Sequence, residues 1–564
     1  MKSSHHNLMI LFIISFLKLE INAQTLIPIP DTLSGNPIHI TIKEGVKQFY
    51  NGFNTATIGY NGNYLGPTLI LNKGQKLNFH VVNDLSDTTT THWHGLHISP
   101  KNDGSPHNPI LPGQTWYPSF TVMDNASTYW YHPHLHGKTF QQVIKGAAGL
   151  IIVRDPEEAK LILPRTYGTD DIPLIFQFQT MDAVTKQIRV NDELDNTTMV
   201  NGTINPMVNC PAQIVRLRLL NASSHRVFRF GFKDGRTFYQ IASDGGLLNT
   251  PIAMTKLNLG NGERAEILVD FSGQEGKSFY IQQYGNELPQ GFMGGPSMMG
   301  MQLGPLDNKT FDLLKINVST QTPNAVTTIP QNLTTNKLIP ESGAAARTIR
   351  LTAQPMMSTT NFFINAVKFD EEVINFTVKQ NDVEIWTITN QTMMAHPFHI
   401  HGNPFYILSI NGSAPPANMQ GIKDVVMIPP MNGSVRLVTK YSDFSDPDIP
   451  YMYHCHILTH EDNGMMGQFL VAPNTTANVD ELNFSDIRIF PIPTYGFLTI
   501  ENKSILKHIE AITIYDVFGR IILKNKIKPI ENFKQLDLSE LTAGQFFLHM
   551  QSSTNVQIFK IIKI

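Results

Sequence analysis

The fold of this chain can be inferred from fourteen consecutive residues, Tyr453-His454-Cys455-His456-Ile457-Leu458-Thr459-His460-Glu461-Asp462-Asn463-Gly464-Met465-Met466. In a β-strand, successive side chains point to opposite faces, so Cys455 would face away from His454 and His456. His460 and Met465 follow in a loop that can fold back to the cysteine side. A thiolate, a thioether and imidazoles form the ligand set of a blue-copper site, and the two flanking histidines can serve a second metal centre. The alternative is a buried cysteine beside solvent-facing histidines.

The start of the chain indicates an exported protein. Residues 1–24 have the pattern of a secretory signal, because Lys2 precedes the apolar run 8–17 and Ala23 lies in a small-residue cleavage region. That run is too short to span a membrane comfortably, and no later stretch does so.

A formal net charge of −3 gives no reason to expect nucleic acid or an anionic membrane as a partner. The two cysteines, Cys210 and Cys455, exclude a disulfide framework, and a monomer is expected.

Alternating short runs and frequent turn residues predict an all-β protein. Runs such as 77–81 and 215–219 alternate in polarity, and the chain contains 39 glycines and 35 prolines. Strands at regular spacing with turn signals between them are typical of β-sandwiches and β-barrels. We therefore expect a signal at 1–24, β domains at 25–155, 156–340 and 345–473, and a small β domain at 484–564.

Four histidine pairs, each with one residue in between, reveal an internal repeat. They are His92/His94, His132/His134, His399/His401 and His454/His456. The first and third pairs are related by a constant spacing, because Asn83, His92, His94 and Gly95 recur 307 residues later as Asn390, His399, His401 and Gly402. The second and fourth pairs lie 322 residues apart. This self-similarity indicates that regions 25–155 and 345–473 are copies of one unit.

The two copies differ at the centre of the second pair. Pro133 occupies the place of Cys455, so only the later copy can provide a thiolate ligand. The region between the copies contains His225 as its one histidine, so we expect a spacer or a wall of the substrate site. Eight paired histidines from two related units can converge on a shared cluster at their interface. The alternative, a solvated histidine-rich surface, does not explain the constant spacing.

These motifs resemble the four copper motifs of multicopper oxidases, above all of bacterial laccases and copper-efflux (cuprous) oxidases. They are His-Trp-His-Gly at 92–95, Trp-Tyr-His-Pro-His-Leu-His-Gly at 130–137, His-Pro-Phe-His-Ile-His-Gly at 396–402, and the stretch at 454–466. The resemblance covers roughly residues 30–473. It implies three cupredoxin-like Greek-key β-barrel domains and four coppers per chain, one of type 1, one of type 2 and two of type 3.

The resemblance also implies a role for each ligand. It assigns His396, Cys455, His460 and Met465 to type 1, His92 and His399 to type 2, and His94, His132, His134, His401, His454 and His456 to type 3. An electron taken at type 1 can then pass from Cys455 through His454 or His456 to the cluster. Four such steps reduce dioxygen to water.

Two acids match family positions that are credited with supplying protons. They are Asp103, in Asn-Asp-Gly, and Glu461, directly after His460. Reduction of dioxygen at a buried site consumes protons, so a carboxylate relay is chemically needed. For Asp103, the alternative is an ordinary turn residue.

The donor should approach type 1 at His460 or His396, which we expect to reach the surface. Met394 matches a methionine of the cuprous-oxidase substrate site, but Thr392 stands where that subgroup has an acid. The subgroup's long Met/His-rich insertion is missing here, and only Met356 and Met357 lie in that region. An open type 1 edge and axial Met465 predict phenols and aromatic amines as the main donors, with weaker Cu(I) oxidation.

Two other functional classes remain as alternatives. A nitrite-reductase-like copper enzyme would lack the eight-histidine set, so the four intact pairs count against it. A non-catalytic copper-binding protein is favoured by the methionine-rich stretch 291–301, which can equally be a flexible glycine-rich loop.

Residues 484–564 resemble the C-terminal sorting domain of the type IX secretion system. The stretches 489–496, 514–520 and 538–544 carry the likeness, although the first lacks the usual asparagine. The resemblance implies a small β-sandwich that directs the protein through the periplasm to the cell surface or the medium. The alternative is an accessory β domain.

Overall fold

The structure is a computed structural model that describes residues 24–190, 193–297, 303–356, 358, 360–474, 487–502, 509–526, 533–552 and 556–564. The expected signal at 1–24 lies outside these residues except for Gln24. The chain divides into two compact units, Met1–Asn474 and Thr475–Ile564. Within the described ranges, no helix has the length and apolar character needed to cross a membrane.

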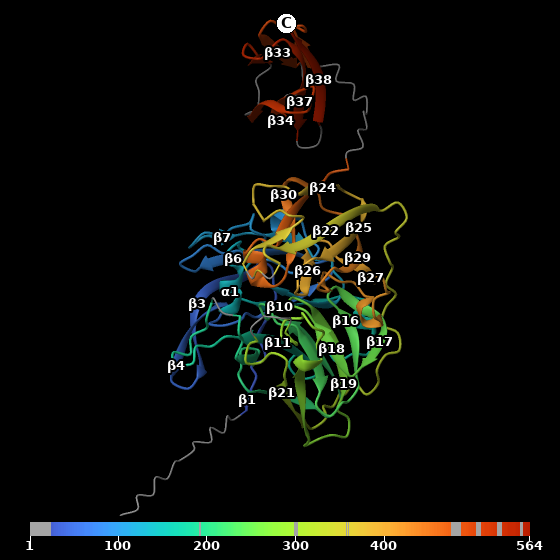
Figure 1. Ribbon diagram of the computed structural model, residues 1–564. Coiled ribbons are helices and arrows are strands. Elements are labelled where there is room, and N and C mark those ends of the chain that lie inside the picture. The colour runs from blue at the N-terminus through green and yellow to red at the C-terminus, as the bar shows by residue number, and fades with distance from the viewer. Residues whose placement is uncertain are drawn as a thin grey trace, which may run out of the picture. The chain divides into compact units, whose positions relative to one another are not determined.

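Strands account for nearly all regular structure, as Figure 1 shows. The α-helices of the described residues are two short segments, α1 (Thr139–Ile144) and α2 (Leu458–Asp462). Alternation explains the strands: in β25 (Val383–Asn390), every second side chain is buried, as expected for a strand with one face on a core. The all-β prediction is confirmed.

The early part of the first unit forms two sheets around one core. One sheet has the order β4 (Phe53–Tyr60), β3 (Ile38–Tyr50), β6 (Lys76–Asp84) and β7 (Thr115–Trp116), with β8 (Ser119–Thr121) also on β6. The other has the order β2 (Thr32–Leu33), β5 (Thr68–Asn72), β10 (Gly149–Arg154) and β9 (Ser127–Tyr131). Their buried side chains, including Trp93 and Tyr131, form a continuous cluster.

The middle part also forms two sheets. One has the order β12 (Thr197–Val200), β11 (Asp171–Gln179), β14 (Ile214–Asn221), β19 (Arg264–Asp270), β16 (Phe238–Ser243) and β17 (Gly246–Met254). The other has the order β1 (Thr25–Leu26), β13 (Pro206–Pro211), β21 (Thr310–Ser319), β20 (Ser278–Tyr284), β15 (Phe228–Phe232) and β18 (Lys256–Leu259). Residues 25–26 therefore pair with the middle part. Cys210, in β13, is buried and free.

The late part repeats the two-sheet plan. One sheet has the order β23 (Phe362–Ile364), β22 (Ala345–Ala353), β25, β29 (Gly433–Lys440) and β27 (Phe405–Ile410). The other has the order β24 (Phe376–Lys379), β31 (Met466–Ala472), β30 (Asp446–Cys455), β26 (His396–Ile400) and β28 (Val425–Ile428). Its core includes Cys455 and Met465.

One asparagine turn occurs in all three parts. Asn83, Asn221 and Asn390 are buried near the ends of β6, β14 and β25. Each side-chain oxygen accepts the backbone N–H two residues later, at 2.9, 3.0 and 2.9 Å. The middle part is thus a third copy of the unit. The histidine pairs could not reveal this, because the middle part has no such pair.

The second unit is a smaller pair of sheets. One has the order β32 (Ile487–Phe490), β33 (Phe497–Asn502) and β36 (Phe533–Asp537). The other has the order β35 (Ile521–Lys526), β34 (Ile509–Asp516), β37 (Gly544–Ser552) and β38 (Val556–Lys563). Leu498, Ile514 and Leu548 are among the buried residues of its own core.

Candidate metal centre

The late copy places cysteine and histidines as strand alternation predicts. In the antiparallel pairing of β26 with β30, Phe398 lies opposite Cys455 and His399 lies opposite His454. His401 and His456 follow directly after the ends of these strands. In the early copy, by contrast, His92 and His132 lie outside the named strands and form an isolated bridge with each other.

A sulfur site forms on one side of β30. Cys455 Sγ lies 3.3 Å from His396 Nδ1 and 3.8 Å from His460 Nδ1, and the two histidine nitrogens are 3.2 Å apart. The turn at α2 brings His460 back to the cysteine. Met465 is buried in the same core, and its backbone oxygen accepts the Cys455 N–H at 3.0 Å. The loop therefore folds back as the sequence predicts.

Burial sets the protonation of this site. It lowers the pKa of His396 to about 3 and raises the pKa of the Cys455 thiol. The imidazole is therefore neutral and ready to bind a metal ion at neutral pH. Because a metal ligand must be the thiolate, an ion that binds here has to displace the thiol proton.

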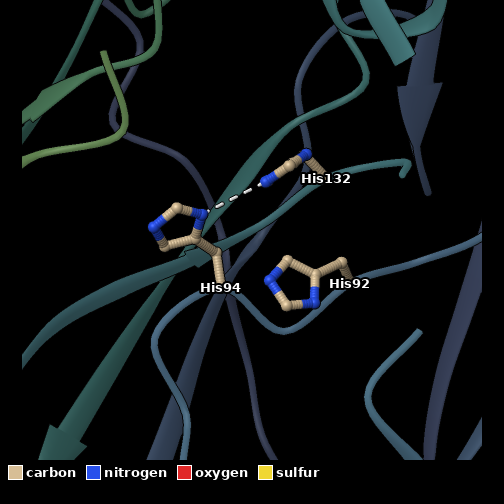
Figure 2. A group of neighbouring side chains, drawn as sticks. All are labelled: His92, His94 and His132. Carbon is tan, nitrogen blue, oxygen red and sulfur yellow. Dashed lines mark hydrogen bonds between the residues drawn. The ribbon is translucent and has the colours of Figure 1, made fainter. Parts of the chain in front are cut away.

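A cluster of eight buried histidines forms on the other side of the strand. One trio consists of His134, His401 and His454, whose Nε2 atoms are 3.0, 3.1 and 3.1 Å apart. A second trio consists of His94, His132 and His456. His94 Nδ1 lies 3.3 Å from Nε2 of each of its two partners, and Figure 2 shows how His94 points to His132.

The remaining two cluster histidines have one ring nitrogen free of protein partners. His92 Nδ1 donates to the backbone oxygen of Asp103 at 2.9 Å, and His399 Nδ1 donates to that of Asp424 at 2.8 Å. A carbonyl oxygen can only accept, so each Nε2 carries a lone pair. Both Nε2 atoms are buried without a hydrogen-bond partner.

These donor sets fit copper. Three Nε2 atoms about 3 Å apart cannot all hydrogen-bond to one another, because each neutral imidazole has a single N–H. A metal ion that binds each nitrogen at roughly 2 Å brings its ligands to this separation. Imidazole with a thiolate selects copper in the sulfur site, and imidazole alone suits copper in the cluster. Burial lowers the pKa of His94, His134 and His401 well below the usual value, so these imidazoles are uncharged and each keeps one nitrogen lone pair for a metal ion.

Both acids predicted to supply protons lie against the cluster. His401 Nδ1 donates to Asp103 Oδ2 at 2.7 Å. Glu461 Oε2 lies 3.1 Å from His454 Nδ1, and Glu461 Oε1 lies 3.5 Å from His134 Nδ1. Burial on its own would raise the pKa of Glu461, but the neighbouring imidazoles outweigh it and lower that pKa below its usual range.

The expectation that His460 and His396 reach the surface is wrong for the described residues. They are 1% and 0% exposed. The ring of Phe362 lies 4.0 Å from that of His460, and the Thr392 hydroxyl lies 2.7 Å from His396 Nε2. Met394, the predicted substrate residue, is 5% exposed.

The cover over Met394 comes from the middle part of the chain. Ala395 N–H donates to Gly291 O at 2.8 Å, and Met293 packs on the late core. A cavity of about 40 Å³ is lined by Met293, Met394 and Asp307 among others. Residues 298–301 of the methionine-rich stretch, and Met357, lie outside the described residues, whereas Met356 is 58% exposed.

Sequence reasoning missed two residues at the cluster. Asp424 Oδ1 lies 3.2 Å from His94 Nε2, and Arg264, from β19, donates to both oxygens of that carboxylate. The repeat could have revealed Asp424, which follows Asp103 by 321 residues, close to the spacing of the second histidine pairs. Arg264 comes from the middle part, where no repeated histidine drew attention.

Comparison with known families agrees with this geometry. Sequence profiles described as "Multicopper oxidase" match residues 41–158, 177–296 and 343–475. A profile described as "Secretion system C-terminal sorting domain" matches residues 488–564, so the chain carries an export signal at its C-terminal end.

Two curated relatives match most of the first unit. "Multicopper oxidase mco" from Staphylococcus haemolyticus is 35% identical over 440 residues, which cover 76% of this chain and 87% of the relative. "Cell division protein FtsP" from Xenorhabdus nematophila is 32% identical over 457 residues, which cover 80% and 93%.

Solved structures give the same result. A bacterial laccase-like multicopper oxidase, CueO from Ochrobactrum sp., has oxidase activity towards lignin model compounds and lignosulfonate. It is 33% identical with a TM-score of 0.71, and the match covers 79% of this chain and 100% of that one. A metallo-oxidase from Campylobacter jejuni is 29% identical with a TM-score of 0.67, and the match covers 80% and 98%. With its profiles, relatives and histidine cluster in agreement, the chain belongs to the multicopper oxidase family.

Proposed function

We propose that this protein is a copper oxidase that takes single electrons from a donor at the sulfur site and reduces dioxygen to water at the histidine cluster. One observation carries the proposal. Cys455 belongs to the sulfur site, whereas its neighbours His454 and His456 belong to different trios of the cluster. One covalent path therefore joins the site of donor oxidation to both halves of the cluster.

The residues that would hold four coppers follow from the groups described above. Type 1 would use His396, Cys455, His460 and Met465, type 2 would use His92 and His399, and the two type 3 ions would use His94/His132/His456 and His134/His401/His454. Bound copper supplies the one-electron redox chemistry, which side chains alone lack.

Asp103 and Glu461 are proposed to supply the protons that oxygen reduction consumes. Each is buried and contacts a ring nitrogen of a cluster histidine, Asp103 at His401 and Glu461 at His454. A proton that arrives on either carboxylate is therefore next to the reacting centre, within the reach that proton transfer in acid catalysis requires.

Phenols and aromatic amines are the donors predicted from the sequence. The structural relative with activity on lignin model compounds supports that proposal. The covered sulfur site weakens it, because the cavity at Met394 holds about 40 Å³. Pockets that enclose organic ligands usually measure roughly 300–1,000 Å³.

The geometry favours Cu(I) as the preferred donor. Met293 and Met394, two residues with soft thioether side chains, line the same small cavity as Asp307. Soft ligands select Cu(I). The Thr392 hydroxyl hydrogen-bonds to Nε2 of His396, which is the ring nitrogen that a phenol would otherwise approach. We therefore rank Cu(I) above bulky phenols, with laccase activity as the second candidate.

Two experiments test these proposals. Oxygen uptake by copper-loaded protein separates an oxidase from a copper-binding protein: no uptake with any donor would contradict the oxidase. Steady-state kinetics with Cu(I) and with a dimethoxyphenol then rank the donors. Met394→Leu should lower kcat/KM for Cu(I) and leave the phenol unchanged. A higher kcat/KM for the phenol in the wild type would restore the laccase ranking.

We also propose domain limits and a route of export. The limits are those expected from the sequence, 25–155, 156–340 and 345–473, with residues 25–26 joined to the second domain through β13. The sorting domain at the end of the chain supports delivery by a type IX system through the periplasm to the surface or the medium.

A further inference from the structure

Two aspartates hold cluster histidines in a crossed arrangement. The backbone oxygen of Asp103 accepts a hydrogen bond from His92 of its own copy, and its carboxylate accepts one from His401 of the other copy. The backbone oxygen of Asp424 accepts a hydrogen bond from His399 of its own copy, and its carboxylate contacts His94 of the other copy. Asp424 is therefore the structural counterpart of Asp103.

The two aspartates differ in which ring nitrogen they occupy. Asp103 binds Nδ1 of His401, so Nε2 points to the first trio. Asp424 binds Nε2 of His94, so Nδ1 points to the second trio. A neutral imidazole has one N–H, and a carboxylate fixes it on the nitrogen that it contacts. The lone pair of His94 is thereby placed on Nδ1.

Arg264 holds Asp424 in place. Its guanidinium donates to Asp424 Oδ1 at 2.7 Å and to Oδ2 at 2.5 Å, a two-point contact that fixes the carboxylate plane. The same side chain donates to the backbone oxygens of Thr128, Gly262 and Asp244. Its direction is therefore fixed by both the early and the middle copies.

The surrounding backbone is shaped for this contact. Gly95 follows His94 with φ +89°, and a Cβ there would lie 2.4 Å from Asp424 Oδ2 and 2.7 Å from Arg264 Nη2. The ring of His94 stacks on that of His399 at 3.8 Å and 8°. Any rotation that exchanges the His94 nitrogens would have to break both the stack and the carboxylate contact.

We propose that Asp424, held by Arg264, is a positioning residue that presents His94 to copper through Nδ1. The inference rests on the proposed function, because it takes the second trio as a copper site. It also gives the middle copy a role beyond that of a spacer: the middle copy supplies the arginine that sets one ligand of the cluster.

The test compares copper retention in Asp424→Asn with that in the wild type. An asparagine offers Arg264 and His94 one acceptor oxygen where the carboxylate offers two, so the proton on His94 Nε2 loses its fixed partner. We expect copper retention by the second trio to weaken by about 10–100-fold, the usual cost of losing such a partner. Chelator competition would measure it. The two proposed type 3 coppers should also cease to act as a pair, so a larger fraction of the bound copper should be detected by electron paramagnetic resonance, while the blue band of the type 1 site stays.

Glu384→Gln is the matched control. Glu384 is a buried carboxylate of the late copy that accepts two hydrogen bonds from Arg347, without any histidine contact. It should lose similar thermal stability and keep the copper pair. If Asp424→Asn fails to fold, Arg264→Lys, which keeps the charge and removes the two-point contact, replaces it.

The outcomes separate the two levels of the proposal. Equal copper retention and equal resonance spectra in the wild type, Asp424→Asn and Glu384→Gln would overturn the positioning role alone. The same loss of the copper pair in Glu384→Gln would reduce the effect to general destabilisation. A wild type that takes up no copper would contradict the proposed function, and the positioning role with it.

Discussion

The early and late copies contribute equally to the histidine cluster and unequally to everything else. At the positions of His396 and Cys455 in the late copy, the early copy has Thr89 and Pro133, and the strand registers place Ala147 at the position of Met465. The fold around both sets is the same, because both copies keep the asparagine turn and the paired sheets. A sulfur site therefore depends on four side chains placed on a common framework, and the cluster depends on both frameworks meeting.

Cys455→Ser should have the largest effect, because it removes the ligand that the early copy lacks. We predict loss of the blue band and a fall of donor oxidation to background, since a serine oxygen is a poor replacement for a soft thiolate. Copper in the cluster should remain, because the Cys455 sulfur contacts the sulfur-site histidines, and the Cys455 contact with His454 uses the backbone oxygen, which a serine keeps. Absorption spectra with copper analysis would check this, and a blue variant would contradict the type 1 assignment.

Much of this asymmetry could be predicted from the sequence. The constant spacings identify the histidines that come together, and alternation places Cys455 opposite to its neighbours. The division into trios could not be predicted, because it depends on which ring nitrogen each backbone oxygen or carboxylate occupies. The cover of the sulfur site was missed for a related reason: Met293 belongs to the middle copy, far from Met394 in sequence.

The two aspartates offer the next comparison. Asp103→Asn should slow dioxygen reduction by about a hundredfold, the lower range for loss of a general acid, and leave copper bound. Asp103 differs from Asp424 in that Arg264 contacts Asp424, so the two isosteric changes should separate turnover from copper retention. Glu461→Gln should resemble Asp103→Asn. Stopped-flow reoxidation of reduced protein would measure the rate, while anaerobic reduction of type 1 by donor should stay fast.

If Asp103→Asn loses as much copper as Asp424→Asn, the two aspartates do not divide between turnover and copper retention. Unchanged reoxidation in Asp103→Asn and Glu461→Gln across neutral pH would remove both acids from the mechanism.

Acid pH should moderately lower the free energy of unfolding of the copper-free protein, because histidines that are buried and neutral in the folded chain become protonated on unfolding. Burial lowers the pKa of His396 and His456 to about 3 in the folded chain, against about 6.5 in the unfolded chain. Above about pH 6.5, neither state is protonated and the stability is complete; as the pH falls towards 3, the unfolded state takes up protons that the folded state cannot. Each histidine should contribute a slope of about 1.4 kcal/mol per pH unit in that window.

Urea unfolding of the copper-free protein at several pH values between 5 and 7 would measure this slope. His396→Gln should reduce the proton uptake on unfolding by about one proton, because glutamine does not titrate. An identical slope in the variant would show that His396 is not held neutral by burial.

Removal of residues 475–564 should have the smallest effect on the oxidase. These residues form a unit with its own buried core, and both copies with all predicted ligands lie before it. We predict unchanged copper content and thermal midpoint for the shortened protein, and its retention in the periplasm, because the sorting signal is gone. Fractionation of cells that express the full and the shortened chain would locate each form. Full-length protein outside the cell with the tail retained would favour an accessory domain, and secretion of the shortened chain would contradict a sorting role outright.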